Sequence, residues 1–332
     1  MKDIFLDKII LITGGTGSLG RALTKHLLKF HNPRAIRIFS RDELKQWQMK
    51  EDLQNYPNVD NVIRYLIGDV RDKDRLKRAS EDVDILIHAA ALKQVPACEY
   101  NPIEAIRTNI DGTVNVIEAA LDNNIKKAIA VSSDKACHPI NLYGATKLCS
   151  EKLFIQANSY RGKRDTIFSV SRYGNVMGSR GSVIPLFLNQ LKNKELTLTH
   201  KDMTRFWISL DEAVLFVINC IEKMKGSEVF IPKIPSVKIM DLAKVIGGNT
   251  KIRIIGKRPG EKLHEVLINK DEAGYVVDMG NNYIIYPMVN TTVKGKKVSG
   301  DFEYTSLTND YFLTANTIKK LLKNVSLSNS SS

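Results

Sequence analysis

A short apolar run that leads directly into glycines limits what this chain can fold into more than any other feature of its sequence. Lys8–Thr13 reads KIILIT, which is typical of a strand buried on both faces of a parallel sheet. Residues 13–20 then read TGGTGSLG, and Leu23, Leu27 and Leu28 recur at helical spacing. Strand, glycine turn and helix in this order predict the first βαβ unit of a doubly wound α/β domain of the Rossmann type.

The glycine turn also predicts a binding site. Gly14, Gly17 and Gly20 carry no side chains, so backbone N–H groups at the positive end of the helix can approach a pyrophosphate. A dinucleotide is therefore expected at this turn. The residues predicted to contact it are Gly14, Thr16, Gly17, Ser18, Leu19 and Gly20.

The end of the second predicted strand bears on which dinucleotide binds. Ile36–Ser40 is followed by Arg41, Asp42 and Lys45, so a hydroxyl and a guanidinium precede the first acid. This order suits a 2′-phosphate and favours NADP over NAD, with Ser40, Arg41, Asp42 and Lys45 as contacts. The alternative, that Arg41 is only a surface charge at a helix entry, stays open at this point.

Further strand ends extend the predicted cofactor site. Val62–Ile67 is a third strand, and Asp84–Ala91 is a fourth that closes in small residues, against which a flat nicotinamide can lie. A helix over 103–122, a fifth strand at Ala128–Ser132 and a sixth at Ile167–Arg172 complete the doubly wound pattern. The added cofactor contacts are Asp69, Val70, Ala89, Ala90, Ala91 and Lys93.

Residues 132–147, SSDKACHPINLYGATK, combine the groups needed for acid–base chemistry. If the run from Leu142 is helical, Tyr143 and Lys147 lie on one face and their polar ends can meet. A nearby ammonium lowers the pKa of a phenol, which would make Tyr143 a base that takes a proton from an alcohol. Ser133 provides a hydroxyl ten residues before Tyr143, and Asp134 and Lys135 follow it side by side.

Beyond Arg172 the regular alternation fails. Tyr173–Pro185 is predicted to be a loop that folds over a ligand, and the later segments mix polar loops with short elements. The predicted organisation is a cofactor domain over 1–174, with returning segments around 203–232, and a smaller C-terminal substrate lobe over 175–323. Residues 324–332, rich in Ser and Asn, are expected to form a disordered tail.

Composition excludes several classes of protein. The formal charge of +13 suits an anionic partner, but the basic residues are scattered and no nucleic-acid-binding signature is present. No apolar run approaches ~18 residues, and acids stand where a signal peptide has its apolar core, so no membrane span and a cytoplasmic location are expected. The cysteines lack metal-ligand spacing and predict reduced thiols and no metal: Cys98, Cys137, Cys149 and Cys220.

Together the motifs resemble the extended short-chain dehydrogenases/reductases, and within them the inverting UDP-N-acetylglucosamine 4,6-dehydratases of pseudaminic acid biosynthesis. The resemblance runs from about Ile9 to about Leu267. It is carried by the glycine turn and by Ser40–Lys45, Gly68–Asp72, His88–Lys93, Glu99–Pro102, Asp134–Ala136, Asn141–Lys147, Arg172–Val176, Gly178–Ser182, Met203–Trp207 and Arg258–Lys262.

The resemblance implies a reaction and roles for residues. Tyr143 would take the C4 hydroxyl proton of the sugar, with Lys147 holding the phenolate and the cofactor ribose. Lys135 would then be the base at C5 and Asp134 the acid toward the departing C6 hydroxyl, with Ser133 beside them. These roles require a neutral Lys135 and a protonated Asp134.

The resemblance also implies a substrate, UDP-N-acetylglucosamine, and a site for it. Arg205 and Arg258 would clamp phosphate oxygens, and Asn175 would meet a phosphate or sugar group. The full set of predicted substrate contacts is Lys93, Lys135, Asn175, Val176, Ser182, Val183, Thr204, Arg205, Arg258 and Glu261. A homodimer, or a hexamer built from dimers, is expected through the helices near 103–122 and 143–160.

Three departures from the family pattern leave the details of the substrate open: Ser133 replaces Thr, Gln94 replaces His and His138 replaces Asn. Two other functions also stay open. A 4-epimerase or another hexose dehydratase of the same superfamily would use the Tyr–Lys pair, although an epimerase has no need of Asp134 and Lys135. A protein that only senses NADP would be expected to lack that pair.

Overall fold

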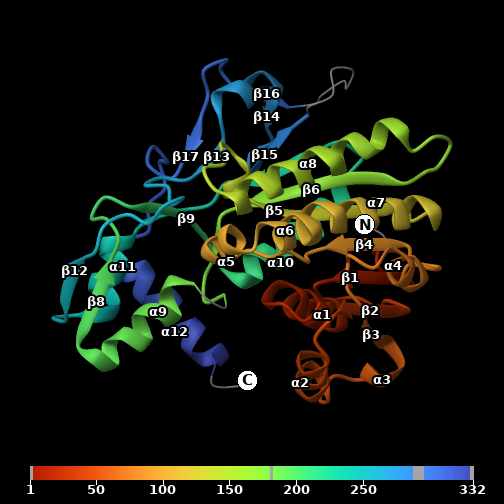
Figure 1. Cartoon of the computed structure of the whole chain (residues 1–332), viewed down its shortest axis with the longest axis horizontal. Helices are drawn as coiled ribbons and strands as arrows, with labels where there is room; N and C mark the ends of the chain where they lie inside the picture. The colour runs from red at the N-terminus through yellow and green to blue at the C-terminus, as the bar shows by residue number, and fades with distance from the viewer. Residues whose placement is uncertain (1–2, 180–181, 287–294, 330–332) are drawn as a thin grey trace.

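A sheet of ten strands runs through the molecule (Figure 1). The structure, a computed structural model, describes residues 3–179, 182–286 and 295–329. Across the sheet the strands lie in the order β16 (Lys296–Lys297), β14 (Val276–Asp278), β15 (Asn282–Ile285), β10 (Val229–Pro232), β6 (Ile167–Tyr173), β5 (Lys127–Ser133), β4 (Ile85–His88), β1 (Ile9–Thr13), β2 (Ala35–Ser40) and β3 (Ile63–Ile67).

The order β3-β2-β1-β4-β5-β6 confirms the predicted doubly wound α/β fold. These strands and β10 pair in parallel, so their carboxyl ends lie at one edge of the sheet. β15, β14 and β16 then extend the sheet by antiparallel pairing. The fourth predicted strand is shorter than expected, because β4 ends at His88 and Ala89–Ala91 form the loop after it.

Helices cover both faces of the sheet. On one face α4 (Lys73–Ala79), α7 (Gly112–Asp122) and α8 (Leu142–Tyr160) pack side by side, and α1 (Ser18–Phe30) packs against α10 (Leu210–Lys223) on the other. The predicted helix over 103–122 is divided into α6 (Pro102–Ile106), a π-helical turn at Arg107–Asp111, and α7. The other helices are α2 (Glu43–Leu53), α3 (Val59–Val62), α5 (Val95–Tyr100), α9 (Val183–Gln190), α11 (Ile239–Gly247) and α12 (Ala315–Asn329).

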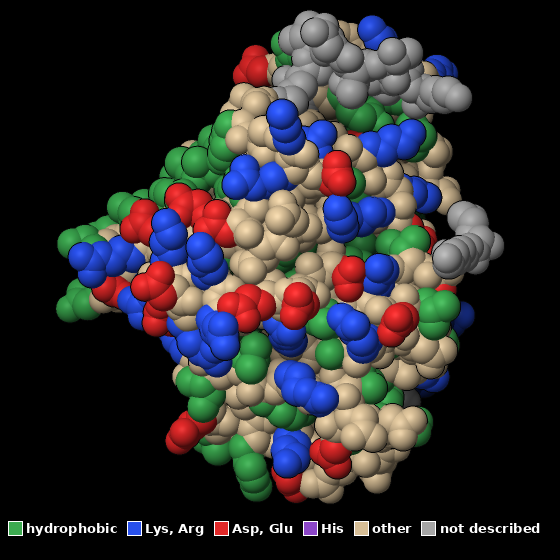
Figure 2. All heavy atoms as spheres, turned by 90° about the vertical axis from the view of Figure 1, so that its right-hand side faces the viewer, with side chains coloured by type: hydrophobic (Ala, Val, Ile, Leu, Met, Phe, Trp, Pro, Cys, Tyr) green, Lys and Arg blue, Asp and Glu red, His purple; other side chains and the backbone are tan. Residues whose placement is uncertain are grey.

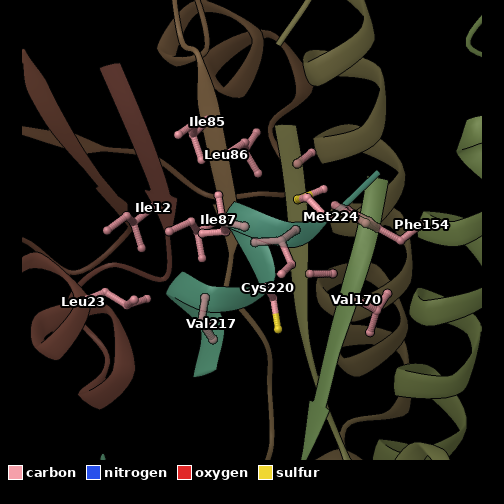
Figure 3. Close-up of a cluster of buried hydrophobic side chains, with 14 of the residues drawn as sticks. Ile12, Leu23, Ile85, Leu86, Ile87, Phe154, Val170, Val217, Cys220 and Met224 are labelled. Carbon is pink, nitrogen blue, oxygen red and sulfur yellow. The ribbon is translucent and has the colours of Figure 1, made fainter. Parts of the chain in front are cut away.

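The main core lies between the sheet and these helices. Figure 3 shows Val217, Cys220 and Met224 of α10 beside the side chains of β1 and β4, among them Ile12 and Ile87. All five are at most 3% exposed. The unbroken apolar runs of the parallel strands are thus explained by burial on both faces.

A second core lies in the C-terminal half, where smaller sheets meet α9, α11 and α12. Its members include Phe187, Leu196, Trp207, Leu242 and Ile318, all of which are buried. The strands of this half outside the large sheet are β7 (Asn175–Val176), β8 (Glu195–Leu198), β9 (Thr204–Ile208), β11 (Ser236–Lys238), β12 (Lys251–Ile254), β13 (Val266–Ile268) and β17 (Tyr304–Thr305).

Two segments differ from the predicted organisation. Strands β14, β15 and β16 join the large sheet, although residues 276–297 were assigned to the substrate lobe, because β15 completes the hydrogen bonding of β10. Residues 324–329, predicted to begin a disordered tail, instead form the last part of α12. Ile318 of this helix packs into the second core. Residues 330–332 lie outside the described residues.

Charged side chains of both signs are spread over the face shown in Figure 2, where Lys and Arg alternate with Asp and Glu. None of the described helices is both long and apolar enough to cross a bilayer.

Candidate active site

A pocket with a volume of about 870 Å³ lies at the carboxyl ends of the parallel strands. It extends from the glycine turn to the second core of the C-terminal half. With two exceptions, every residue predicted to bind cofactor or substrate or to act in catalysis lines it. The exceptions are Asp134, which is fully buried behind the wall, and Thr204, whose hydroxyl is bonded to His264 and Ser306.

The glycine turn has the shape of a dinucleotide cradle. Gly14 has φ +68°, and a Cβ there would lie 2.8 Å from the backbone of Ala90. A Cβ at Gly20 would lie 2.5 Å from the carbonyl oxygen of Gly15. Any side chain would therefore separate the turn from its neighbours, and α1 begins at Ser18 with its first N–H groups directed toward the pocket end of the helix. These features fit a pyrophosphate.

Asp42, the first acid after β2, already accepts a hydrogen bond within the chain. The Asp42 carboxylate accepts from the backbone N–H of Lys45 and so caps α2. Arg41 lies in the pocket wall with its side chain 56% exposed, and its Nη1 is 3.5 Å from Asp69 Oδ2. An exposed guanidinium at this position can turn toward a phosphate without losing a buried contact.

The start of α8 is fixed by two side chains. Asn141 Oδ1 accepts from the backbone N–H of Gly144, and Glu99 Oε1 accepts from that of Leu142 at 2.7 Å. Gly144 is needed here, because a Cβ would lie 2.4 Å from the carbonyl oxygen of Lys135. The first turn of α8 therefore packs directly on the turn that carries Lys135.

Tyr143 and Lys147 both lie on α8 and are buried, and no hydrogen bond joins their polar ends within the described residues. Lys147 Nζ instead donates to the carbonyl of Val131 in β5 at 2.6 Å. Burial lowers the pKa of Lys147 to about 8. Burial raises the pKa of Tyr143 to about 12, and the cation that most opposes this rise is Lys135.

Asp134, Lys135 and Glu265 form a buried charge cluster. Lys135 Nζ lies 2.9 Å from Asp134 Oδ1 and 3.3 Å from Glu265 Oε1. Burial lowers the pKa of Lys135, but the two carboxylates raise it by more, so its pKa lies above the ordinary value. Burial raises the pKa of Asp134, although Lys135 opposes the rise. The raised pKa of Asp134 has the direction that an acid requires, whereas the raised pKa of Lys135 has the direction opposite to the neutral amine that was expected.

A buried polar network links β1, β4, the π-helical turn and α8. His88 Nδ1 is 2.8 Å from Thr13 Oγ1, and burial lowers the pKa of His88 to about 3, so this imidazole is neutral. Asn109, in the π-helical turn, donates to the carbonyl of Leu92 and to Thr146 Oγ1 of α8. The extra residue of a π turn is thus used to place Asn109 between the end of β4 and the helix that carries Tyr143.

Two buried polar atoms in the pocket wall have no hydrogen-bond partner among the described residues. Asn175 Oδ1 and Ser182 Oγ are buried and have no hydrogen bond within the described part of the chain. Both residues line the pocket, so a polar ligand there would satisfy them. Residues 180–181 of the predicted ligand-covering loop lie outside the described residues, and the rest of that loop contains β7 and the start of α9.

The two predicted phosphate clamps differ in their surroundings. Arg258 is exposed at the pocket rim. Arg205 is 8% exposed, and its guanidinium donates to the carbonyls of Thr204, Lys262 and Leu263. Arg205 therefore holds the 261–265 segment in place, and few of its N–H groups remain for a phosphate.

Behind the pocket, Arg172 of β6 joins three parts of the chain. Its guanidinium pairs with Glu151 of α8 at 2.6 Å and with Glu272 at 2.8 Å, and it also donates to the carbonyl of Leu267. Both Arg172 and Glu151 have side chains only 3% exposed. The C-terminal segment is thereby attached to the catalytic helix.

Sequence reasoning gave no role to Glu265, Asn109 or Glu99. Glu265 follows Glu261 by four residues in a segment already singled out, but no spacing shows that it meets Lys135 from the other half of the chain. A metal site was not expected, and the described residues contain no group of three metal-ligating side chains.

Residues 10–287 match a family model described as polysaccharide biosynthesis protein. The chain is 51% identical over 317 residues to the inverting UDP-N-acetylglucosamine 4,6-dehydratase of Campylobacter jejuni, covering 91% of this chain and 93% of that protein. It is 45% identical to a UDP-glucose 4-epimerase of Rickettsia bellii, with 97% of each covered. The X-ray structure of Pen from Bacillus thuringiensis superposes with a TM-score of 0.91 at 40% identity, covering 98% of this chain and 99% of that one.

Proposed function

Because this chain belongs to the polysaccharide biosynthesis protein family, within the extended short-chain dehydrogenases/reductases, we propose that it is an inverting UDP-N-acetylglucosamine 4,6-dehydratase. The observation that carries the proposal is the buried Asp134–Lys135 pair next to Tyr143 at the pocket. A place in pseudaminic acid or a related surface-glycan route is part of the same proposal.

The arrangement supplies the acid and base groups that the reaction needs. The C5 proton of a hexose is scarcely acidic until C4 becomes a ketone. A nicotinamide dinucleotide held at the glycine turn would supply the hydride acceptor for C4 and, in its reduced form, the hydride for C6. Tyr143 takes the C4 hydroxyl proton, and Lys147 would leave the Val131 carbonyl to hold the phenolate. Lys135, whose pKa is raised in the resting site, would have to lose a proton before it takes the C5 proton, while Asp134, whose pKa is raised by burial, gives its proton to the departing C6 hydroxyl.

The enzyme is expected to convert UDP-N-acetylglucosamine without an added reductant. Proton NMR in heavy water should show a new methyl signal, deuterium at C5 and the L-arabino configuration. If the product keeps its C6 hydroxyl and differs from the substrate only in configuration at C4, the protein is a 4-epimerase and not a dehydratase. Retention at C5 would leave a dehydratase but refute inversion.

A 4-epimerase is the second candidate, since the Rickettsia relative carries that name. An epimerase moves a hydride off C4 and back, so it needs Tyr143 but neither a base at C5 nor an acid at C6. Here Asp134 is fully buried, Lys135 is partly exposed to the pocket, and both are bonded to Ser133 and to each other. A buried ion pair with no task in epimerisation favours the dehydratase.

We also propose NADP as the cofactor, with Arg41 as the contact to its 2′-phosphate. Arg41→Ala should weaken NADP binding about tenfold or more and leave NAD binding nearly unchanged, because a hydrogen bond to a charged group contributes about 1.5–3 kcal/mol. Arg64→Ala, which removes an exposed guanidinium bonded to local carbonyls, is the matched control. Fluorescence titration measures all affinities, and tighter binding of NAD than NADP by the unchanged protein would refute the assignment.

The predicted two-fold assembly through α6, α7 and α8 remains a proposal. These helices lie together on one face of the large sheet, and Ile103 and Ile106 of α6 are 62% and 40% exposed.

A further inference from the structure

Asn141 makes a second contact that the cap of α8 does not require. Its Oδ1 accepts from the backbone N–H of Gly144 at 2.8 Å, which is the cap itself. Its Nδ2 donates to the carbonyl of Gly260 at 2.8 Å, across 119 residues of sequence. One side chain therefore joins the helix that carries Tyr143 to a segment of the C-terminal half.

Gly260 belongs to a tight turn at the edge of the pocket, residues 258–261, which we call the rim turn. The N–H of Glu261 donates to the carbonyl of Arg258 at 3.1 Å, and the Glu261 carboxylate accepts from the N–H of Arg258 at 3.2 Å. Pro259 followed by Gly260 at φ +71° is the arrangement of a type II β-turn. The rim turn thus has a shape of its own, and its placement against the pocket depends on its contacts with other elements.

The segment that follows the rim turn is anchored separately. Lys262 Nζ donates to the carbonyl of Cys137 at 2.5 Å, and Arg205 donates to the carbonyl of Lys262 at 2.9 Å. Within the rim turn, Glu261 Oε1 lies 3.8 Å from Arg205 Nη2, which is beyond hydrogen-bond distance. The hydrogen bond from Asn141 holds the tip of the turn, which these anchors do not reach.

The rim turn also packs closely on the start of α8. A Cβ at Gly260 would lie 3.0 Å from Asn141 Cβ and 3.7 Å from the carbonyl oxygen of Ile140. Arg258 of the turn and Tyr143 of the helix both line the pocket. The contact therefore sets the separation between the group proposed to meet the C4 hydroxyl and the group proposed to meet the diphosphate.

We propose that Asn141 is a positioning residue for the UDP-sugar, which holds the rim turn on the first turn of α8 and so places Arg258 relative to Tyr143. Without the amide donor of Asn141, the turn occupies this position for a smaller fraction of the time, and the apparent affinity falls by that fraction. The inference rests on the part of the proposed function that makes a UDP-sugar the substrate. It applies to a dehydratase and to a 4-epimerase alike.

The test separates the cap of α8 from the contact with Gly260. In Asn141→Ser the hydroxyl still caps the helix, but it is one bond shorter than the amide and does not reach the Gly260 carbonyl. In Asn141→Ala both interactions are lost. UDP is the probe, titrated by calorimetry into the full chain in the presence of NADP. Both variants should bind UDP about fivefold to tenfold more weakly, the range for one lost hydrogen bond, whereas only Asn141→Ala should lower the melting temperature.

Steady-state kinetics gives a readout that a merely structural role would not move. In Asn141→Ser the KM for UDP-N-acetylglucosamine should rise as the UDP affinity falls. The kcat should change less than about threefold, because the cap and the packing of Gly144 on Lys135 keep Tyr143 in place. A double-mutant cycle tests whether Asn141 acts through Arg258: Arg258→Ala should weaken UDP binding by the unchanged protein, but little further in Asn141→Ser.

Asn269→Ser is the matched control. Asn269 caps the 3₁₀-helix Lys270–Tyr275 with its Oδ1 and donates from its Nδ2 to Cys137 Sγ, but it is not among the residues that line the pocket. Its UDP affinity should stay within about twofold of that of the unchanged protein. Unchanged UDP binding by Asn141→Ser, or additive losses in the cycle, would overturn the inference alone. If the unchanged protein binds no UDP, the proposed UDP-sugar substrate fails and the inference fails with it.

Discussion

Lys135→Arg is expected to lower the rate of dehydration by about 10²–10⁴-fold, the usual contribution of a general base. Arg keeps a cation between Asp134 and Glu265, so the buried carboxylates stay compensated. A guanidinium is not deprotonated in proteins and cannot take the C5 proton. The measurement is the appearance of the methyl signal in heavy water, together with titration of the UDP-sugar, whose affinity should stay within about threefold.

Tyr143→Phe is the comparison for this variant. It removes the group that takes the C4 proton, so the first oxidation should fail before Lys135 is needed. If Lys135→Arg binds substrate, melts normally and still dehydrates at the unchanged rate, Lys135 is not the base.

Arg172→Met should destabilise the protein by about 3–5 kcal/mol, because it leaves the buried Glu151 and the half-buried Glu272 without their cation. The substitution also removes the hydrogen bond that the Arg172 guanidinium donates to the Leu267 carbonyl. Denaturant unfolding measures the free energy, and the midpoint should fall while the slope is unchanged.

Lys126→Ala is the control for the loss of an ion pair. Lys126 and Asp165 are 3.1 Å apart, but their side chains are 61% and 81% exposed. The change should be less than about 1 kcal/mol. Equal effects of the two substitutions would show that the burial of Arg172 adds nothing to stability.

The periodicity of apolar residues was sufficient to predict the central strands, since burial on both faces leaves an unbroken apolar run. It failed where a charged residue is buried. The segment around 203–207 was expected in a mixture of polar loops and short elements, and the burial of β9 throughout was not foreseen, because Arg205 gives its N–H groups to nearby carbonyls. A pattern of residue types does not show that such a charge is satisfied.

The site was predictable where its residues are close in the chain. The glycine turn and the groups from Ser133 to Lys147 are set by local structure, and the pocket contains all of them except Asp134. The contact between Lys135 and Glu265 was not predictable, because Glu265 lies just before β13, in the other half of the chain. The same applies to Lys147, whose nearest acceptor is a backbone carbonyl that no sequence pattern reveals.

The attachment made by Arg172 has a consequence for the order of events during synthesis. Arg172 and Glu272 are 100 residues apart, so a ribosome must deliver a long further stretch before the guanidinium gains its second carboxylate. Contacts of this separation form late and slow folding. A nascent chain that has completed β6 can thus have its glycine cradle in place while Lys135 still lacks Glu265, and cofactor affinity should be acquired earlier in biogenesis than turnover.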